Sequence, residues 1–205
     1  MSAVNSIYNH IFIHVPKNAG SSMERKAYVG GHGHDTLYEI TKKFKDTIDF
    51  KNYIPWGFVR NPYDRLVSLY HFWRENEVPM ANLPFDNFIK DYIRNHTTIN
   101  ILTYLENKEH FNVGVQPQFL FFDNDVYSPD EVFFGKVESI DSDYKEILGK
   151  IENKSKRKIK DKTLNKVNTS KRSHYRSYYN NETFDLVYEI YKFDFKHFGY
   201  EREQL

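Results

Sequence analysis

The 205-residue sequence predicts an α/β protein: one domain, residues 1–205, in which helices flank a central, mainly parallel sheet. Two observations lead to this expectation. Residues 11–15 and residues 53–59 are apolar runs, and each is followed closely by a signal for the start of a helix. The length suffices for one well-filled core, and nothing in the composition requires a second domain.

The composition is that of a folded protein. Hydrophobic residues make up 40% of the chain and charged residues 28%, while the aromatic share of 17% is high. The absence of cysteine excludes disulfides and thiolate metal sites. Residues 1–6 contain no signal-like basic and apolar regions, and no apolar run approaches the roughly 18 residues of a membrane span. We therefore expect a cytoplasmic, soluble protein that does not contact membranes.

The net charge of +1 conceals one strongly basic segment, residues 154–176. Only Asp161 opposes its ten cationic side chains, which are Lys154, Lys156, Arg157, Lys158, Lys160, Lys162, Lys166, Lys171, Arg172 and Arg176. The segment is either a solvated loop or a surface that holds an anion, and the sequence leaves both possibilities open. Because the basic residues are confined to this stretch, nucleic acid is not an expected partner.

The first motif is the stretch from the apolar residues 11–15 into the loop at residues 16–22. This order predicts a strand, a loop and then a helix to about residue 28, with Ser21 and Glu24 forming a capping box. A turn of this kind exposes N–H groups and the positive end of a helix beside Lys17, which favours a phosphate or sulfate group. The predicted P-loop-like anion site comprises Pro16, Lys17, Asn18, Ala19, Gly20, Ser21 and Ser22.

The second motif begins at Arg60, at the end of the strand predicted over residues 53–59. Asn61 is a good N-cap, and Pro62 suits the first position of the helix that follows. Ser68 lies opposite the apolar stripe of this helix, so Arg60 and Ser68 can both reach a small anion at the carboxyl edge of the sheet. The alternative is that Arg60 and Arg65 only pair with acids and that Ser68 is incidental.

The rest of the chain predicts further helices and strands around these motifs. Thr36 caps an expected helix at residues 37–44, and a glycine-rich loop before it carries His32 and His34. Further helices are expected at residues 85–94, 99–105, 139–151 and 181–198, and strands at residues 119–122 and 131–137. Aromatic side chains such as Tyr70, Trp73, Phe85 and Phe88 suit a sugar platform, but their helical spacing favours core packing.

Together these motifs resemble the sulfotransferase superfamily, in particular its carbohydrate sulfotransferase branch. The resemblance rests on residues 14–22, on residues 58–70 and on three later stretches, residues 136–138, 168–170 and 194–200. One departure lies in the first loop, where Asn18 and Ala19 stand in place of the Thr-Gly of many relatives. Because Ala restricts the backbone more than Gly, the conformation of this loop is the open question.

The resemblance implies transfer of a sulfuryl group from 3′-phosphoadenosine 5′-phosphosulfate to an acceptor hydroxyl, leaving adenosine 3′,5′-bisphosphate. The loop at residues 16–22 would hold the 5′-phosphosulfate, with Lys17 on the bridging oxygen, and Arg60 and Ser68 would hold the 3′-phosphate. Asn168, Ser170, Lys171 and Arg172, within the basic segment, would close over the nucleotide. No metal is expected, because lysine, arginine and N–H groups neutralise the leaving phosphate.

The acceptor hydroxyl needs a general base, and histidine is the usual choice near neutral pH. Related carbohydrate sulfotransferases carry a catalytic histidine at a comparable place, so we expect His34, or failing that His32, to be the base. His14 is expected to be a packed or hydrogen-bonding residue. The resemblance favours a glycan as acceptor, although another hydroxyl-bearing molecule is compatible with the sequence.

Two other functional classes remain open at this point. A nucleotide-dependent kinase also uses a strand, loop and helix around a lysine, but Lys17 precedes the small residues and the Gly-x-x-x-x-Gly-Lys-Ser/Thr pattern is absent. A non-catalytic anion-binding module would use the basic segment as its main surface. Stabilisation by adenosine 3′,5′-bisphosphate, by ATP with magnesium or by a polyanion distinguishes the three classes.

Overall fold

The computed structural model describes residues 3–24, 33–108, 112–164 and 172–205. The chain divides into two compact units, and each is described by itself below. The first unit comprises Met1–Val59 and Phe121–Asn168, and the second comprises Arg60–Leu120 and Thr169–Leu205. The expected organisation as one functional domain stays a prediction.

The first unit is built on a four-stranded sheet with the strand order β1-β2-β3-β4. β2 pairs in parallel with β3, and β3 in parallel with β4, whereas β1 pairs antiparallel with β2. The strands are β1 (Val4–Asn5), β2 (His10–Ile13), β3 (Ile54–Val59) and β4 (Phe133–Lys136). This arrangement confirms the predicted α/β fold with a mainly parallel sheet.

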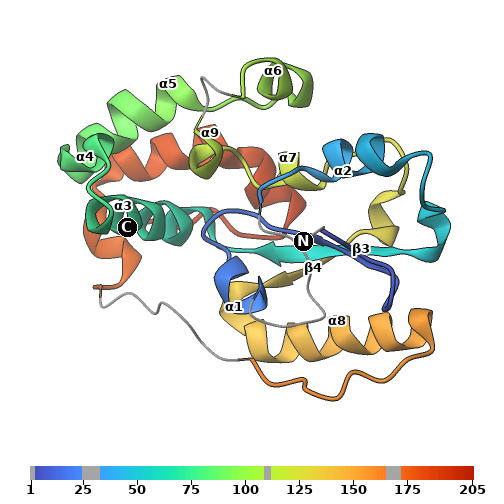
Figure 1. Cartoon of the computed structure of the whole chain (residues 1–205). Coiled ribbons are helices and arrows are strands. Elements are labelled where there is room, and N and C mark those ends of the chain that lie inside the picture. The colour runs from blue at the N-terminus through green and yellow to red at the C-terminus, as the bar shows by residue number, and fades with distance from the viewer. Residues whose placement is uncertain (1–2, 25–32, 109–111, 165–171) are drawn as a thin grey trace. The chain divides into compact units, whose positions relative to one another are not determined.

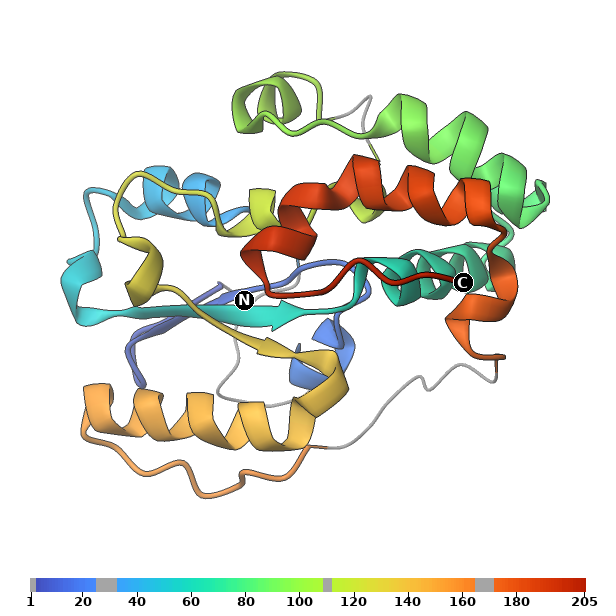
Figure 2. The same cartoon turned by 180° about the vertical axis from the view of Figure 1, so that it is seen from behind.

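Helices cover both faces of this sheet, which explains why every residue of β2 and β3 is buried. Figures 1 and 2 show α8 (Ile140–Ser155) along one face and α2 (Leu37–Phe44) over the other. As predicted, Thr36 is the N-cap of α2, and the structure adds that Thr36 and Glu39 form a capping box there. A third helix, α1 (Gly20–Glu24), follows the loop after β2. The apolar core between the sheet and α8 includes Phe12, Trp56, Phe58, Tyr144, Ile147, Leu148 and Ile151.

The second unit is helical, and its longest elements are α3 (Pro62–Glu75) and α9 (Asn181–His197). The start of α3 confirms the prediction, because Asn61 accepts a hydrogen bond from the N–H of Tyr63 and Pro62 occupies the first turn. The end of α9 agrees as well, since Gly199 has a φ of 62° just beyond it. The shorter elements are α4 (Phe85–Asn87), a π-helical segment (Phe88–Ile93), α5 (Arg94–His96), α6 (Ile101–Glu106) and α7 (Phe119–Phe122), of which α7 continues into the first unit.

Aromatic side chains dominate the core of the second unit, where α3, α9 and the stretch from α4 to α5 pack against one another (Figure 2). Tyr63 and Phe184 stack with their ring centroids 3.8 Å apart. The side chains considered as a sugar platform, Tyr70, Trp73, Phe85 and Phe88, are all buried in this core. Core packing is therefore the correct interpretation of their helical spacing.

Two expected elements differ in the structure. The strand expected at residues 119–122 is the short helix α7, because the carboxylate of Asp194 accepts hydrogen bonds from the N–H groups of Gln118 and Phe119 and fixes a first helical turn. The first helix begins at Gly20, so Ser21 lies inside its first turn and is not the N-cap of the expected capping box with Glu24. No helix in the described part of the chain is both long enough and apolar enough to span a membrane.

Candidate active site

The loop after β2, residues 16–22, has an unusual backbone, and we call it the first loop. Lys17 and Ala19 have φ values of 67° and 62°, whereas Asn18 and Gly20 do not share this positive φ. The sign of φ therefore alternates over four successive residues. Such alternation turns successive N–H groups toward one side and forms a concave anion-binding nest.

The hydrogen bonds around the first loop leave a set of N–H groups for an anion. The N–H of Asn18 donates to the carbonyl of Val15, and the N–H groups of Ser22 and Met23 donate to the carbonyl of Ala19. The N–H groups of Ala19, Gly20 and Ser21 donate to no acceptor in the described part of the chain. Three consecutive donors beside Lys17 are the donor set that a phosphate or sulfate group prefers.

Two side chains hold the first loop in place. Asn18 is 2% exposed, and its side-chain amide donates a hydrogen bond of 2.8 Å to the carbonyl of Phe58 on β3. Gly20 lies against the imidazole of His14, where an added Cβ would stand 1.8 Å from Nε2. Asn18 thus anchors the first loop to the sheet, and the close approach of His14 requires a residue without Cβ at position 20. Of the two serines in the loop, Ser22 is buried and Ser21 is exposed.

A pair of histidines lies next to Gly20. The ring centroids of His14 and His34 are 4.3 Å apart, and Nδ1 of His34 is 2.9 Å from the carbonyl oxygen of His14. A carbonyl oxygen only accepts, so Nδ1 of His34 carries the proton, and in the neutral ring Nε2 carries none. That tautomer is the one a general base requires at Nε2. No sequence pattern indicates the contact between these two residues, which are 20 positions apart.

Several predicted site residues lie outside the described residues. These are His32, Asn168, Ser170 and Lys171. Of the others, the first loop and His34 belong to the first unit, whereas Arg60, Ser68 and Arg172 belong to the second.

The second unit contains a cluster of two arginines and one carboxylate, Arg60, Asp64 and Arg172, which we call the arginine cluster. Nε and Nη2 of Arg60 lie 2.7 and 2.6 Å from Oδ2 of Asp64, and Nη2 of Arg172 lies 2.5 Å from Oδ1 of the same carboxylate. Two cations share one anion, so the cluster retains a net charge of +1. Ser68 is half-buried one helical turn beyond Asp64 and lies on the same face of α3.

Arg60 therefore does pair with an acid, whereas the hydrogen bonds given for Arg65 go to backbone carbonyl groups. The guanidinium of Arg65 is buried and donates to the carbonyl oxygens of Gln116 and Gly114. Burial lowers the pKa of Arg65. Arg65 thus supports the fold of the second unit.

Part of the basic segment has partners within the protein. Lys158 and Lys162 pair with Glu152, and Lys154 donates to the carbonyl of Lys51. Near the other end of the segment, Arg176 pairs with Glu203. Among the described residues of the segment, Arg172 is the one that joins the arginine cluster.

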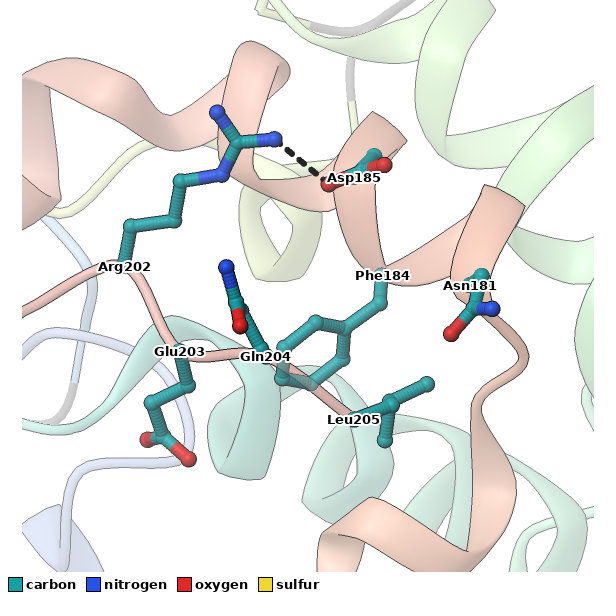
Figure 3. Close-up of a pocket in the computed structure, with 7 residues that line it drawn as sticks. All are labelled: Asn181, Phe184, Asp185, Arg202, Glu203, Gln204 and Leu205. Atoms are coloured by element: carbon teal, nitrogen blue, oxygen red, sulfur yellow. Dashed lines mark hydrogen bonds and ion pairs between the residues drawn. The ribbon is translucent and has the colours of Figure 1, made fainter.

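A pocket of about 490 Å³ lies elsewhere in the second unit, beside the C-terminal residues (Figure 3). Its lining consists of Asn181, Phe184, Asp185, Arg202, Glu203, Gln204 and Leu205, and Arg202 pairs with Asp185 across it at 2.6 Å. None of the predicted site residues lines this pocket. The chemistry predicted from the sequence therefore has to be sought at the first loop and at the arginine cluster.

The described residues also show whether any side chains could together hold a metal ion. Within the described ranges, no group of three or more histidine, cysteine, aspartate or glutamate side chains is arranged to hold a metal ion. The donors found here are N–H groups, a lysine and two guanidinium groups, all of which suit an anion.

Comparisons with known proteins identify the family of this chain. A family model described as "Sulfotransferase family" matches residues 2–201. Comparisons with curated proteins and with solved structures returned no match. Because the family model covers nearly the whole chain, this chain belongs to the sulfotransferase family.

Proposed function

We propose that the protein transfers a sulfuryl group from 3′-phosphoadenosine 5′-phosphosulfate to a hydroxyl group of a carbohydrate. Membership of the family supports sulfotransfer in general. The observation that carries the choice of donor is the first loop, where the N–H groups of Ala19, Gly20 and Ser21, which donate to no acceptor among the described residues, stand beside Lys17. These groups suit a tetrahedral anion with several equivalent oxygens.

The first loop and the arginine cluster suit the two phosphate-bearing ends of this nucleotide. In the proposal the first loop holds the 5′-phosphosulfate, with Lys17 at the bridging oxygen and the serines Ser21 and Ser22 at phosphate oxygens. The arginine cluster and Ser68 hold the 3′-phosphate, which the net charge of the cluster favours. Asn168, Ser170 and Lys171 complete the nucleotide site in the proposal.

The bound donor supplies an activated sulfuryl group, and the residues of this chain position it and balance its charge. Transfer of this kind proceeds in line and depends mainly on position and electrostatic stabilisation. Lys17 neutralises the charge that develops on the leaving phosphate oxygen. His34 accepts the proton of the acceptor hydroxyl at Nε2, because its Nδ1 proton is held by the carbonyl of His14.

The carbohydrate acceptor rests on the resemblance to carbohydrate sulfotransferases at residues 14–22 and 58–70. Transfer of labelled sulfate to a panel of oligosaccharides, phenols and small alcohols tests this part of the proposal. Labelling of oligosaccharides supports it, whereas labelling of phenols or alcohols alone contradicts the carbohydrate assignment and leaves the donor assignment intact.

The donor is tested by thermal unfolding in the presence of adenosine 3′,5′-bisphosphate, ATP with magnesium or a heparin-like polyanion. A ligand at 100 times its dissociation constant stabilises the folded state by about 2.7 kcal/mol. We expect the bisphosphate to raise the melting temperature at the lowest concentration. A larger shift with ATP and magnesium would indicate a kinase, and a larger shift with the polyanion would indicate an anion-binding module.

The general base is tested by the pH dependence of the rate. We expect His34→Ala to lower the rate about 10²-fold or more and to remove the limb of the profile that reports the base. His96→Ala is the matched control, because Nδ1 of His96 also contacts a backbone carbonyl, that of Tyr92, at 2.8 Å. If His34→Ala keeps the wild-type profile at a similar rate, His34 is not the base.

A further inference from the structure

We propose that Gln118 is the positioning residue for Arg60, and that it thereby sets the preference of the enzyme for nucleotides with a 3′-phosphate. This inference rests on the proposed function and deepens it. No feature of the sequence marked Gln118, which lies 58 positions beyond Arg60.

Both backbone polar groups of Arg60 bind the side chain of Gln118. The N–H of Arg60 donates to Oε1 of Gln118 at 2.9 Å, and Nε2 of Gln118 donates to the carbonyl of Arg60 at 2.8 Å. Gln118 is 0% exposed. The amide thus pairs with Arg60 as an adjacent strand would, and it fixes the backbone from which the guanidinium extends.

Gln118 is itself held firmly within the second unit. Its N–H donates to Oδ2 of Asp194 at 2.8 Å, and the neighbouring N–H of Phe119 donates to Oδ1 at 2.9 Å. Asp194 belongs to α9 and is fully buried. A continuous set of hydrogen bonds therefore leads from α9 through Gln118 to the backbone of Arg60.

At its other end, the Arg60 side chain is fixed by Asp64. Nε and Nη2 both lie within 2.7 Å of one carboxylate oxygen of Asp64. Arg60 is thus held at its backbone by Gln118 and at its guanidinium by Asp64. A shift of about 1 Å in such a charged group is enough to weaken its contact with a bound phosphate markedly.

The two hydrogen bonds to the backbone of Arg60 require the amide group of a glutamine side chain. Glutamine offers one acceptor and a donor group at the same end, which is what a backbone N–H and C=O of one residue need. Methionine has nearly the same length but offers neither strong group. Gln118→Met therefore removes both hydrogen bonds to Arg60 while filling nearly the same volume.

A second buried glutamine provides the control. Gln116 is also 0% exposed, and its side chain pairs with the N–H of Thr98 and with the carbonyls of His96 and Asn112. None of these groups belongs to the arginine cluster. Gln116→Met thus removes a comparable set of buried hydrogen bonds and leaves those of Arg60 in place.

The test compares dissociation constants for adenosine 3′,5′-bisphosphate and adenosine 5′-monophosphate by calorimetry. The ratio of the two constants is the 3′-phosphate preference. We expect Gln118→Met to lower this preference about tenfold with little change in monophosphate affinity. Gln116→Met is expected to lower the melting temperature but to keep the wild-type preference.

Gln118→Glu is the second variant and is used where Gln118→Met does not fold. At a pH where its carboxyl group is ionised, the glutamate keeps an acceptor for the N–H of Arg60 but has no donor for the Arg60 carbonyl, so the preference falls in this variant also. A wild-type preference in a folded Gln118 variant overturns the inference. If the wild-type protein binds both nucleotides equally, the proposed function fails instead, and the two failures are distinct.

Discussion

The first loop and the arginine cluster are both suited to anions, but they offer different chemical groups. The first loop uses backbone N–H groups, which point to one side because φ alternates in sign from Lys17 to Gly20. The arginine cluster uses the guanidinium groups of Arg60 and Arg172 around one carboxylate. The first loop is therefore defined by local backbone conformation, and the arginine cluster by charge and by distant contacts.

This difference determines which changes each region tolerates. In the first loop, the side chain of Asn18 holds the backbone through the carbonyl of Phe58. In the arginine cluster, the side chains are the ligands, and the residues that hold them come from far along the chain. Lys17 differs from Asn18, because the side chain of Lys17 supplies positive charge to the first loop.

The largest expected effect comes from Lys17→Ala. Alanine takes up the same positive φ at a similar cost as lysine, so the N–H groups stay in place and only the charge is lost. We expect turnover to fall about 10²-fold or more, by analogy with the loss of one donor to a developing oxyanion. Initial rates at saturating donor measure the effect.

Lys17→Arg serves as the control for this variant, since it keeps the charge and should lose less activity. Nearly full activity of Lys17→Ala would show that the backbone alone performs the work of the first loop.

The next largest effect is expected for Arg60→Gln. A hydrogen bond to a charged group contributes about 1.5–3 kcal/mol, so the affinity for adenosine 3′,5′-bisphosphate should fall roughly 10- to 100-fold. Adenosine 5′-monophosphate should bind as before. Arg202→Gln is the matched control, because Arg202 also pairs with an aspartate, Asp185, outside the cluster. An equal loss for both nucleotides would contradict the assignment of Arg60 to the 3′-phosphate.

The sequence predicted well what local patterns determine. Asn61, Pro62 and the apolar stripe beyond them specify α3, and Thr36 with the helical spacing after it specifies α2. The first loop was located by the order of an apolar strand, Lys17 and small residues. Its positive φ at Ala19 was not predicted, since alanine rarely adopts this conformation and tertiary contacts such as that of Asn18 impose it.

What the sequence could not show depends on residues far apart in the chain. The contact between His14 and His34 joins two loops, and Asp194 reaches Gln118 over 76 positions. The same contact explains why residues 119–122, an apolar run typical of a strand, are helical. A run of four apolar residues is too short to distinguish the period of a helix from that of a strand. The carboxylate of Asp194 therefore determines the structure of this run.

The third prediction concerns pH and the support of the arginine cluster. Burial raises the pKa of Asp194 to about 6 from an ordinary value of 3.8, although the N–H of Gln118 opposes this shift. Between these values the folded protein binds a proton that the unfolded chain has released, so this group makes the free energy of unfolding fall as the pH rises. The fall is about 1.5 kcal/mol between pH 5 and pH 8.

Chemical denaturation of the wild-type protein and of Asp194→Asn over this pH range measures the contribution as a difference. The asparagine variant should lose this component of the pH dependence. Glu203, whose pKa is lowered, loses its contribution at more acidic pH and does not interfere. If the free energy of unfolding depends on pH in the same way in both proteins, Asp194 is ionised over the whole range. The backbone N–H groups of the first loop do not ionise, so they add no comparable pH dependence.

The smallest expected effect tests the backbone of the first loop directly. Ala19 has a φ of 62°, which costs a residue with a Cβ roughly 1–2 kcal/mol relative to glycine. Glycine adds about 0.5–1 kcal/mol of unfolded-state entropy, so Ala19→Gly should stabilise the protein by about 0.5–1 kcal/mol. Ala81→Gly is the control, because Ala81 is buried without a positive φ and should be destabilised by the same change. Destabilisation by Ala19→Gly would mean that the strain at Ala19 is absent in solution, and the alternation of φ that defines the nest would lose its support.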